Sequence, residues 1–119
     1  IARGNYSSAV GYDNTASSAH TSAFGYANSA TATDASAFGR GNTASDAGAS
    51  AYGYNNTASG FNASAFGRTN TAAGIASVAV GYGNTASGDN SLAIGRSNSA
   101  TGNGSNALGS GNSSEATSS

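Results

Sequence analysis

Residues 78–91 read VAVGYGNTASGDNS and residues 92–105 read LAIGRSNSATGNGS, so the second stretch repeats the pattern of the first after fourteen residues. The shared signature is Ala, a larger apolar residue and Gly, with an Asn three residues further on. Aligned on this signature, the whole chain falls into register without an insertion: residues 8–119 form eight complete copies, and residues 1–7 read as the end of a preceding copy. Such strict periodicity is typical of a solenoid, in which each copy buries its inner face only by stacking on its neighbours.

The length of the repeat indicates which kind of solenoid to expect. Helical repeats need about 33 residues and leucine-rich repeats about 20, so only β coils are short enough. Two short strands, one around Ala9 and the other around Ala16, fit the count when two tight turns join them, and Gly and Asn stand where those turns fall. Eight coils stacked about 4.8 Å apart make a rod about 38 Å long. We therefore predict an all-β parallel solenoid that forms a single repeat domain over residues 1–119.

The composition argues against several functions. Leu, Ile, Val and Phe number only 12 of 119 residues, but the formal net charge is −1 and Pro is absent, unlike ordinary disordered chains. Four scattered Arg residues make no basic patch for nucleic acid, and there is no Cys for disulfides or thiolate metal sites. The one His and the five acidic residues are too few and too dispersed to favour a catalytic pair or a metal site. We expect no enzymatic activity, no metal and no cofactor.

One column of larger apolar residues recurs at the centre of the signature. Alternation places it on one face of its strand together with the residue two positions earlier, and Ala on the other face. Where the column is aromatic the earlier residue is Ser, and that residue is larger in Val78 with Val80 and in Leu92 with Ile94. The pairs Ser8 with Val10 and Asn106 with Leu108, near the two ends of the run, do not compensate. Such compensation is typical of residues that share one space. We predict that this column is the structural core inside the coil: Val10, Phe24, Phe38, Tyr52, Phe66, Val80, Ile94 and Leu108.

This assignment leaves the Ala9 column facing outward along the rod. Because so little apolar area would be buried in one chain, we expect a homo-oligomer in which this Ala column packs against its own copies. The opposite assignment stays open, with Ala inside the coil and the apolar column at the subunit interface.

The position after each signature Gly carries the most informative polar pattern. Tyr and Arg alternate there in consecutive copies: Tyr26, Arg40, Tyr54, Arg68, Tyr82 and Arg96. At a spacing of about 4.8 Å each Arg would lie between two Tyr rings in cation–π contact. The ladder either stiffens the turn edge or forms a ligand-facing stripe for a matrix protein or glycan. The Asn column that begins at Asn14 is predicted to stack in a turn, with side-chain amides bonding between coils, and the solitary His20 is expected in a loop.

The repeats also closely resemble a known family. Residues 78–88, VAVGYGNTASG, and residues 91–95, SLAIG, resemble the S-V-A-I-G repeat in the heads of trimeric autotransporter adhesins of the YadA type. The resemblance covers all eight copies, although Ser stands at the Val position in copies one to five. It implies a left-handed parallel β-roll, homotrimeric about the rod axis. It also implies a bacterial surface protein that projects from the outer membrane and attaches to host extracellular matrix or cells.

Two other functions stay open. We find no neck, stalk or anchor sequence, so we expect a fragment of a longer adhesin head, and such a segment could serve as a structural spacer within a surface fibre. The stretches equivalent to Thr15-Ala16-Ser17 also resemble the Thr-x-Thr ranks of ice-binding solenoids, although Ala73 and Glu115 interrupt the second rank.

Overall fold

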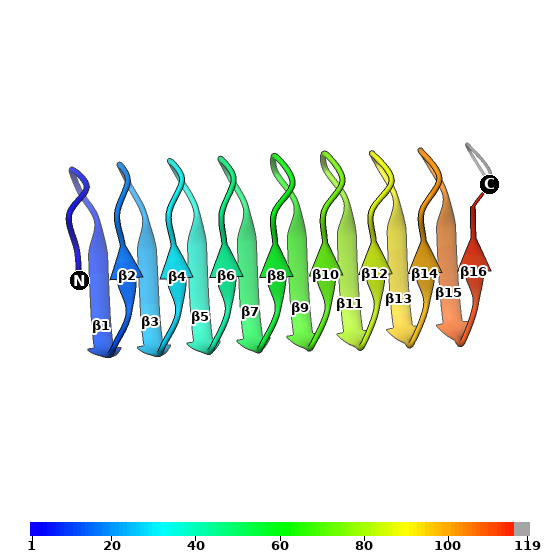
Figure 1. Ribbon diagram of the computed structural model, residues 1–119, viewed down its shortest axis with the longest axis horizontal. Helices are drawn as coiled ribbons and strands as arrows, with labels where there is room; N and C mark the ends of the chain where they lie inside the picture. Colours follow the sequence, from blue (N-terminus) through cyan, green and yellow to red (C-terminus); the bar gives the residue numbers. More distant parts are fainter. Residues whose placement is uncertain (116–119) are drawn as a thin grey trace.

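The computed structural model describes residues 1–115 as a stack of flattened β coils (Figure 1). Each coil contains one five-residue strand and one two-residue strand. The long strands are β1 (Ser8–Tyr12), β3 (Ser22–Tyr26), β5 (Ser36–Arg40), β7 (Ser50–Tyr54), β9 (Ser64–Arg68), β11 (Val78–Tyr82), β13 (Leu92–Arg96) and β15 (Asn106–Ser110). The short strands are β2 (Thr15–Ala16), β4 (Ser29–Ala30), β6 (Thr43–Ala44), β8 (Thr57–Ala58), β10 (Thr71–Ala72), β12 (Thr85–Ala86), β14 (Ser99–Ala100) and β16 (Ser113–Ser114). The last four residues of the predicted eighth copy, 116–119, lie outside the described part.

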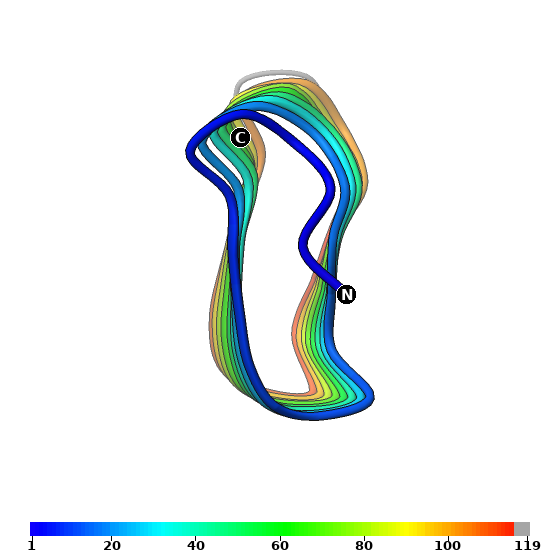
Figure 2. The same cartoon turned by 90° about the vertical axis from the view of Figure 1, so that its left-hand side faces the viewer.

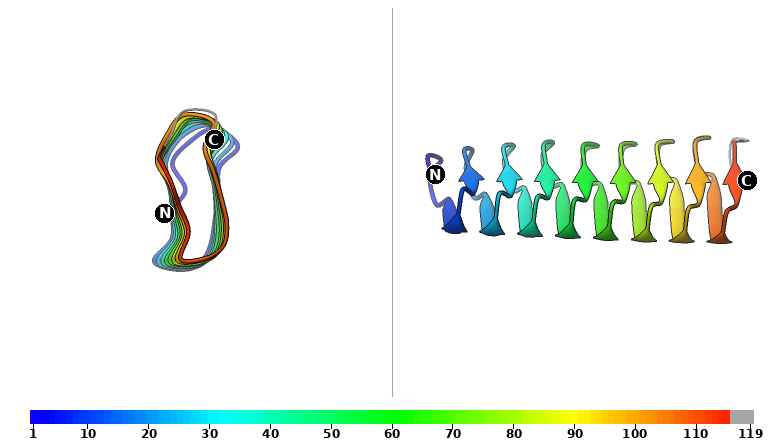
Figure 3. Two further views of the ribbon diagram at one scale, coloured as in Figure 1. Left: turned by 90° about the vertical axis from the view of Figure 1, so that its right-hand side faces the viewer. Right: turned by 60° about the horizontal axis from the view of Figure 1, so that its bottom comes forward.

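The strands form two parallel sheets, one of long strands and one of short strands. Every strand pairs with its equivalent in the next coil, and the register is fourteen residues throughout, as in the pairing of Ala23 with Ala37 and of Phe24 with Phe38. Seen from either end, the coils lie over one another with a gradual rotation (Figures 2 and 3). The longest dimension is 41 Å. The predicted all-β parallel solenoid of fourteen-residue coils is confirmed.

The interior of the coil is filled by small side chains and Asn. In the long strands the buried apolar residues are Ala23, Ala37, Ala51, Ala65, Ala79, Ala93 and Ala107, and in the short strands they are Ala16, Ala30, Ala44, Ala58, Ala72, Ala86 and Ala100. The thinnest dimension of the molecule is 11 Å, about the separation of the two layers alone in an ordinary sandwich of sheets. The buried Ala side chains of both sheets and the buried Asn side chains occupy the space between these layers.

The predicted core column lies on the outside of the coil instead. Because Ala occupies the inward position of each long strand, its two neighbours face outward. The prediction that this column fills the coil is therefore wrong, and so is the prediction that the Ala9 column faces outward. We call this outward-facing column of larger apolar residues the apolar stripe. It consists of Val10, Phe24, Phe38, Tyr52, Phe66, Val80, Ile94 and Leu108.

The Asn column is buried and links consecutive coils. The side-chain amide of Asn42 donates to Oδ1 of Asn28 at 3.0 Å, to the carbonyl of Phe38 at 2.9 Å and to the carbonyl of Gly53 at 2.7 Å. The backbone N–H of Asn42 also donates to Oδ1 of Asn28, at 3.0 Å. The predicted Asn ladder is confirmed, and it satisfies backbone carbonyls that the turn would otherwise leave buried without partners.

The signature Gly allows the coils to approach closely at this turn. Gly39 has a φ of 121°, and a Cβ at this position would lie 2.1 Å from the carbonyl oxygen of Gly53. A side chain is therefore excluded by both backbone conformation and contact. The turn continues two residues later through the left-handed region, which Ala27 and Asn55 occupy with φ of 55° and 53°.

Candidate binding surface

The apolar stripe runs the length of the rod on the outer face of the long-strand sheet. The rings of Phe24 and Phe38 stack with centroids 4.8 Å apart, and those of Phe38 and Tyr52 lie 5.0 Å apart. Residues in the middle of the stripe are half-buried by their neighbours above and below, whereas Val10 and Leu108 at its two ends are each 55% exposed. A continuous exposed apolar surface of this kind marks an interaction site.

The six alternating residues Tyr26, Arg40, Tyr54, Arg68, Tyr82 and Arg96 form what we call the Tyr–Arg ladder. Each is the last residue of its long strand, so the ladder follows the lower edge of the molecule in Figure 1. The guanidinium carbon of Arg40 lies 5.4 Å from the ring centre of Tyr26 and 5.7 Å from that of Tyr54. That of Arg68 lies 5.4 Å from Tyr54 and 5.5 Å from Tyr82. The predicted position between two Tyr rings is confirmed for Arg40 and Arg68, whereas Arg96 contacts Tyr82 alone, at 5.8 Å, because Ser110 follows it in the column.

Charges are segregated between the two edges of the coil. In residues 1–115 no carboxylate pairs with an Arg of the ladder; the ion pair in this part of the chain is between His20 and Asp34. Asp34, Asp46 and Asp89 all lie in the turns that lead from a short strand to the next long strand, on the edge opposite the ladder. Apart from Asp13 near the first coil, the charged residues of the ladder edge are Arg, whereas the opposite edge carries the three Asp residues, with Arg3 in its first connection.

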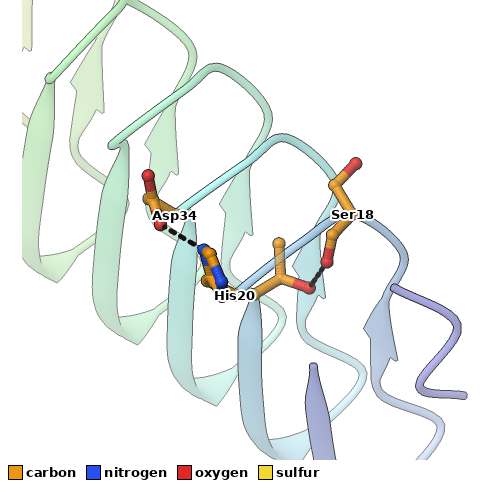
Figure 4. A network of polar contacts seen from close by, with 4 residues as sticks. Ser18, His20 and Asp34 are labelled. Atoms are coloured by element: carbon orange, nitrogen blue, oxygen red, sulfur yellow. Dashed lines mark hydrogen bonds and ion pairs between the residues drawn. The ribbon is translucent and has the colours of Figure 1, made fainter. Parts of the chain in front are cut away.

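The polar cluster on the opposite edge is exposed and local (Figure 4). His20 Nδ1 lies 3.2 Å from Asp34 Oδ1, with the two side chains 56% and 65% exposed. The His20 ring stacks on Tyr6 at 5.5 Å, and the Ser18 hydroxyl donates to the carbonyl of Thr31 at 2.5 Å. Residues 1–115 contain no group of three or more side chains that could hold a metal ion. His20 therefore lies in a turn, as predicted, between Tyr6 and Asp34 in a short column of surface side chains.

Sequence reasoning missed a second apolar feature on this edge. Phe61 and Ile75 occupy the same position in consecutive coils and are 47% and 52% exposed. The sequence does contain a signal for this pair, because the two large apolar residues stand fourteen positions apart in a column of otherwise small or polar residues. The pair covers two coils only, in contrast to the apolar stripe.

The hydroxyl-bearing residues considered for ice binding lie on and beside the short strands. Thr57 is half-buried on the outer face of β8, and Ser59 is exposed just after the strand ends. The ordered strand is only two residues long, so the second rank follows a bend rather than a flat sheet. With Ala73 and Glu115 in that rank, the face lacks two regular rows of Thr.

The surface of this part of the chain is open. Residues 1–115 contain no pocket, and no helix among them is long and apolar enough to cross a membrane. A ligand of this segment would therefore contact an exposed face of the rod.

Comparison with protein families places these features in context. The model of the YadA head domain repeat, described as two copies, matches residues 2–28, 30–56, 58–84 and 86–112. Successive matches begin 28 residues apart, which equals two of the fourteen-residue coils. Among curated proteins, none matches the chain. The family is one of structural adhesin segments and is not known as catalytic. The four matches cover nearly the whole chain. The chain therefore belongs to the YadA head domain repeats of trimeric autotransporter adhesins.

Proposed function

We propose that this chain is the non-catalytic head segment of a bacterial surface adhesin that assembles as a homotrimer through the apolar stripe. In this assembly three left-handed coils lie side by side around the rod axis and project from the outer membrane. The head attaches the cell to host extracellular matrix or to host cells. The observation that carries the proposal is the apolar stripe itself, which leaves eight larger apolar side chains outside a coil filled with Ala and Asn.

The energetics favour a partner for the stripe. Buried apolar surface contributes about 25 cal/mol per Å², and within one chain the buried apolar residues are all Ala. Ordering the backbone costs about 1–2 kcal/mol per residue. Packing of Phe38 and its equivalents against a second and a third copy adds the burial that the single coil lacks.

The volume compensation within each coil fits a parallel arrangement of the copies. Ser36 precedes Phe38 on the same outer face, whereas Leu92 precedes Ile94. Around an axis parallel to the rod, each coil meets the same coil of its partners. From the second copy to the seventh, each level of the assembly then contains three large and three small residues, or six of intermediate size. The compensation that the sequence shows is explained by packing at this outer face.

Sedimentation equilibrium of the isolated chain tests the assembly. We expect a mass of three times the 11.3 kDa of the chain. The variant Phe38→Asp with Phe66→Asp places six carboxylates at the axis of the trimer and should abolish the trimeric mass. The matched control Thr57→Asp lies on the other sheet and should remain trimeric. A monomeric, folded wild-type chain would contradict the proposal.

Attachment is tested separately by binding of the trimeric segment to immobilised matrix proteins and to host cells. We expect saturable binding to at least one of these surfaces. A trimer that binds none of them would instead be a spacer within the fibre, and thermal hysteresis in its solution would favour ice binding.

A further inference from the structure

The faces of the Tyr rings in the Tyr–Arg ladder are already occupied. Tyr54 has the guanidinium of Arg40 at 5.7 Å and that of Arg68 at 5.4 Å. Because the ladder continues in both directions, these contacts cover both faces of the ring. A nucleic-acid base or a sugar ring therefore cannot stack on it, although stacking is how exposed aromatic residues usually bind such ligands. What the ladder presents to a partner is its rim of Tyr hydroxyls and guanidinium N–H groups.

The guanidinium groups are suited to bind anions. Arg carries five N–H donors and no acceptor, and stacking between rings restrains its plane before any ligand arrives. In residues 1–115 these groups have no carboxylate partner. Restraint of this kind lowers the entropy lost when a ligand binds. Each Arg of the ladder is thus an unpaired cation with restricted orientation at an exposed edge.

The spacing of the charges limits the kind of anion. Arg40, Arg68 and Arg96 are separated by two coils each, which places successive guanidiniums about 10 Å apart in a straight row. Two sugar rings in an extended polysaccharide span a similar length. Phosphates in a nucleic-acid strand follow one another more closely, at about 3.4 Å per nucleotide in a duplex. A polymer with one acidic group per disaccharide matches the row; a nucleic acid does not.

The charge distribution confines such a ligand to this edge. The chain has a net charge of −1 and carries Asp34, Asp46 and Asp89 on the opposite edge, so it has no general attraction for polyanions. We propose that the Tyr–Arg ladder binds an extended acidic polysaccharide along the rod, with each Arg contacting the carboxylate or sulfate of successive disaccharides. This inference rests on the proposed function and names the class of ligand that the head binds.

Binding of a hyaluronan fragment to the trimeric chain tests the proposal. Neutral dextran of matched length and single-stranded poly(dT) serve as comparison probes. We expect hyaluronan to bind with an affinity that falls as the NaCl concentration rises, and dextran not to bind. Replacing the row by Arg40→Gln, Arg68→Gln and Arg96→Gln should reduce the affinity roughly tenfold. The control Arg3→Gln lies outside the ladder and should leave the affinity unchanged.

A second variant tests the spacing at constant composition. Tyr54→Arg combined with Arg68→Tyr keeps the net charge and the numbers of Tyr and Arg, but it breaks the regular interval. We expect a several-fold loss of hyaluronan binding. Melting followed by circular dichroism checks that each variant is folded, and the exchange variant carries the test if the triple variant does not fold.

Several outcomes would overturn the inference: absence of hyaluronan binding, equal binding by the triple or the exchange variant, or preference for poly(dT). None of these outcomes bears on the sedimentation mass. A trimer that attaches to matrix proteins but not to hyaluronan refutes the ladder as a polysaccharide site and leaves the proposed function standing.

Discussion

The backbone N–H and the side-chain amide of Asn56 both donate to Oδ1 of Asn42, at 2.9 and 3.1 Å. The same amide donates to the carbonyl groups of Tyr52 and Gly67, at 2.8 and 2.7 Å. Because Asn56 is completely buried, water cannot replace these bonds. The largest buried side chains of the coil are therefore polar, and their pairing between coils substitutes for an apolar core.

Replacement of Asn56 by Asp should destabilise the fold severely. A carboxylate has no N–H to donate, so three acceptors each lose one hydrogen bond and a charge is buried among oxygen atoms. We expect the free energy of unfolding to fall by about 3 kcal/mol or more, measured by urea denaturation. The control is Asn55→Asp, because the neighbouring side chain is exposed and Asp13 holds the equivalent position with a φ of 56°. It should change stability by less than about 0.5 kcal/mol.

Two glycines in one turn should respond differently to a methyl group. The Cβ of Gly81→Ala would lie 2.0 Å from the carbonyl oxygen of Gly95, whereas that of Gly83→Ala would meet its nearest atom, the Ser97 hydroxyl oxygen, at 3.7 Å. Ala27 already occupies the position equivalent to Gly83. We expect Gly81→Ala to prevent cooperative folding and Gly83→Ala to cost about 1 kcal/mol for the left-handed backbone. Similar melting temperatures for the two variants would contradict the packing described for this turn.

Three buried hydroxyls should be dispensable. The Oγ atoms of Ser77, Ser91 and Ser105 lie inside the coil without a hydrogen-bond partner, and Ala35 and Ala49 fill the same column in earlier copies. Since an unsatisfied buried hydroxyl costs about 1 kcal/mol or more, each Ser→Ala change should stabilise the fold by about that amount.

Thermal melting of the three single variants measures this effect. Ser87→Ala, on the outer surface in the column of Ala73, is the matched control and should shift the free energy of unfolding by less than about 0.5 kcal/mol. A loss of stability in the buried variants would mean that these hydroxyls have partners.

The Tyr–Arg ladder should contribute to stability as well as to binding. Arg68 lies between two Tyr rings, and exposed cation–π contacts contribute about 0.5–1 kcal/mol each. Arg68→Ser should therefore lower the free energy of unfolding by about 1 kcal/mol. Arg3→Ser serves as the control because, in residues 1–115, the Arg3 guanidinium stacks on no ring. Equal effects of the two changes would show that the ladder adds nothing to stability.

Much of the fold followed from the period alone. Once equivalent residues are known to stack at one spacing, their positions in the sequence determine three features. These are the pairing of Phe24 with Phe38, the Asn column and the alternation of Arg40 with Tyr54. These features depend on neighbours along the rod, which a repeat specifies completely. The Asn column is confirmed from Asn14 to Asn98, and the alternation of Tyr and Arg from Tyr26 to Arg96.

The orientation of the apolar stripe could not be predicted in the same way. Alternation shows that Ala9 and Val10 face opposite sides, but it does not show which side is inside. The familiar rule that large apolar residues are buried favoured Val10 and its equivalents, and the rule failed because Ala and Asn side chains fill the interior of this coil. The volume compensation gave no help, since two residues that lie side by side on an outer face compensate as well as two inside. Which residues fill the interior depends on both strands and both turns together, and no single column records it.

The constant register also determines how the molecule can change in length. Each coil contacts only the coil before it and the coil after it, through the same pairings. Loss or duplication of twenty-eight codons, which is two coils, therefore rejoins matching edges and keeps the alternation of Tyr and Arg in the ladder. Such a change alters how far the segment reaches by two strand spacings, about 10 Å, without redesign of its surface. Reach can thus vary in small equal steps at almost no energetic cost.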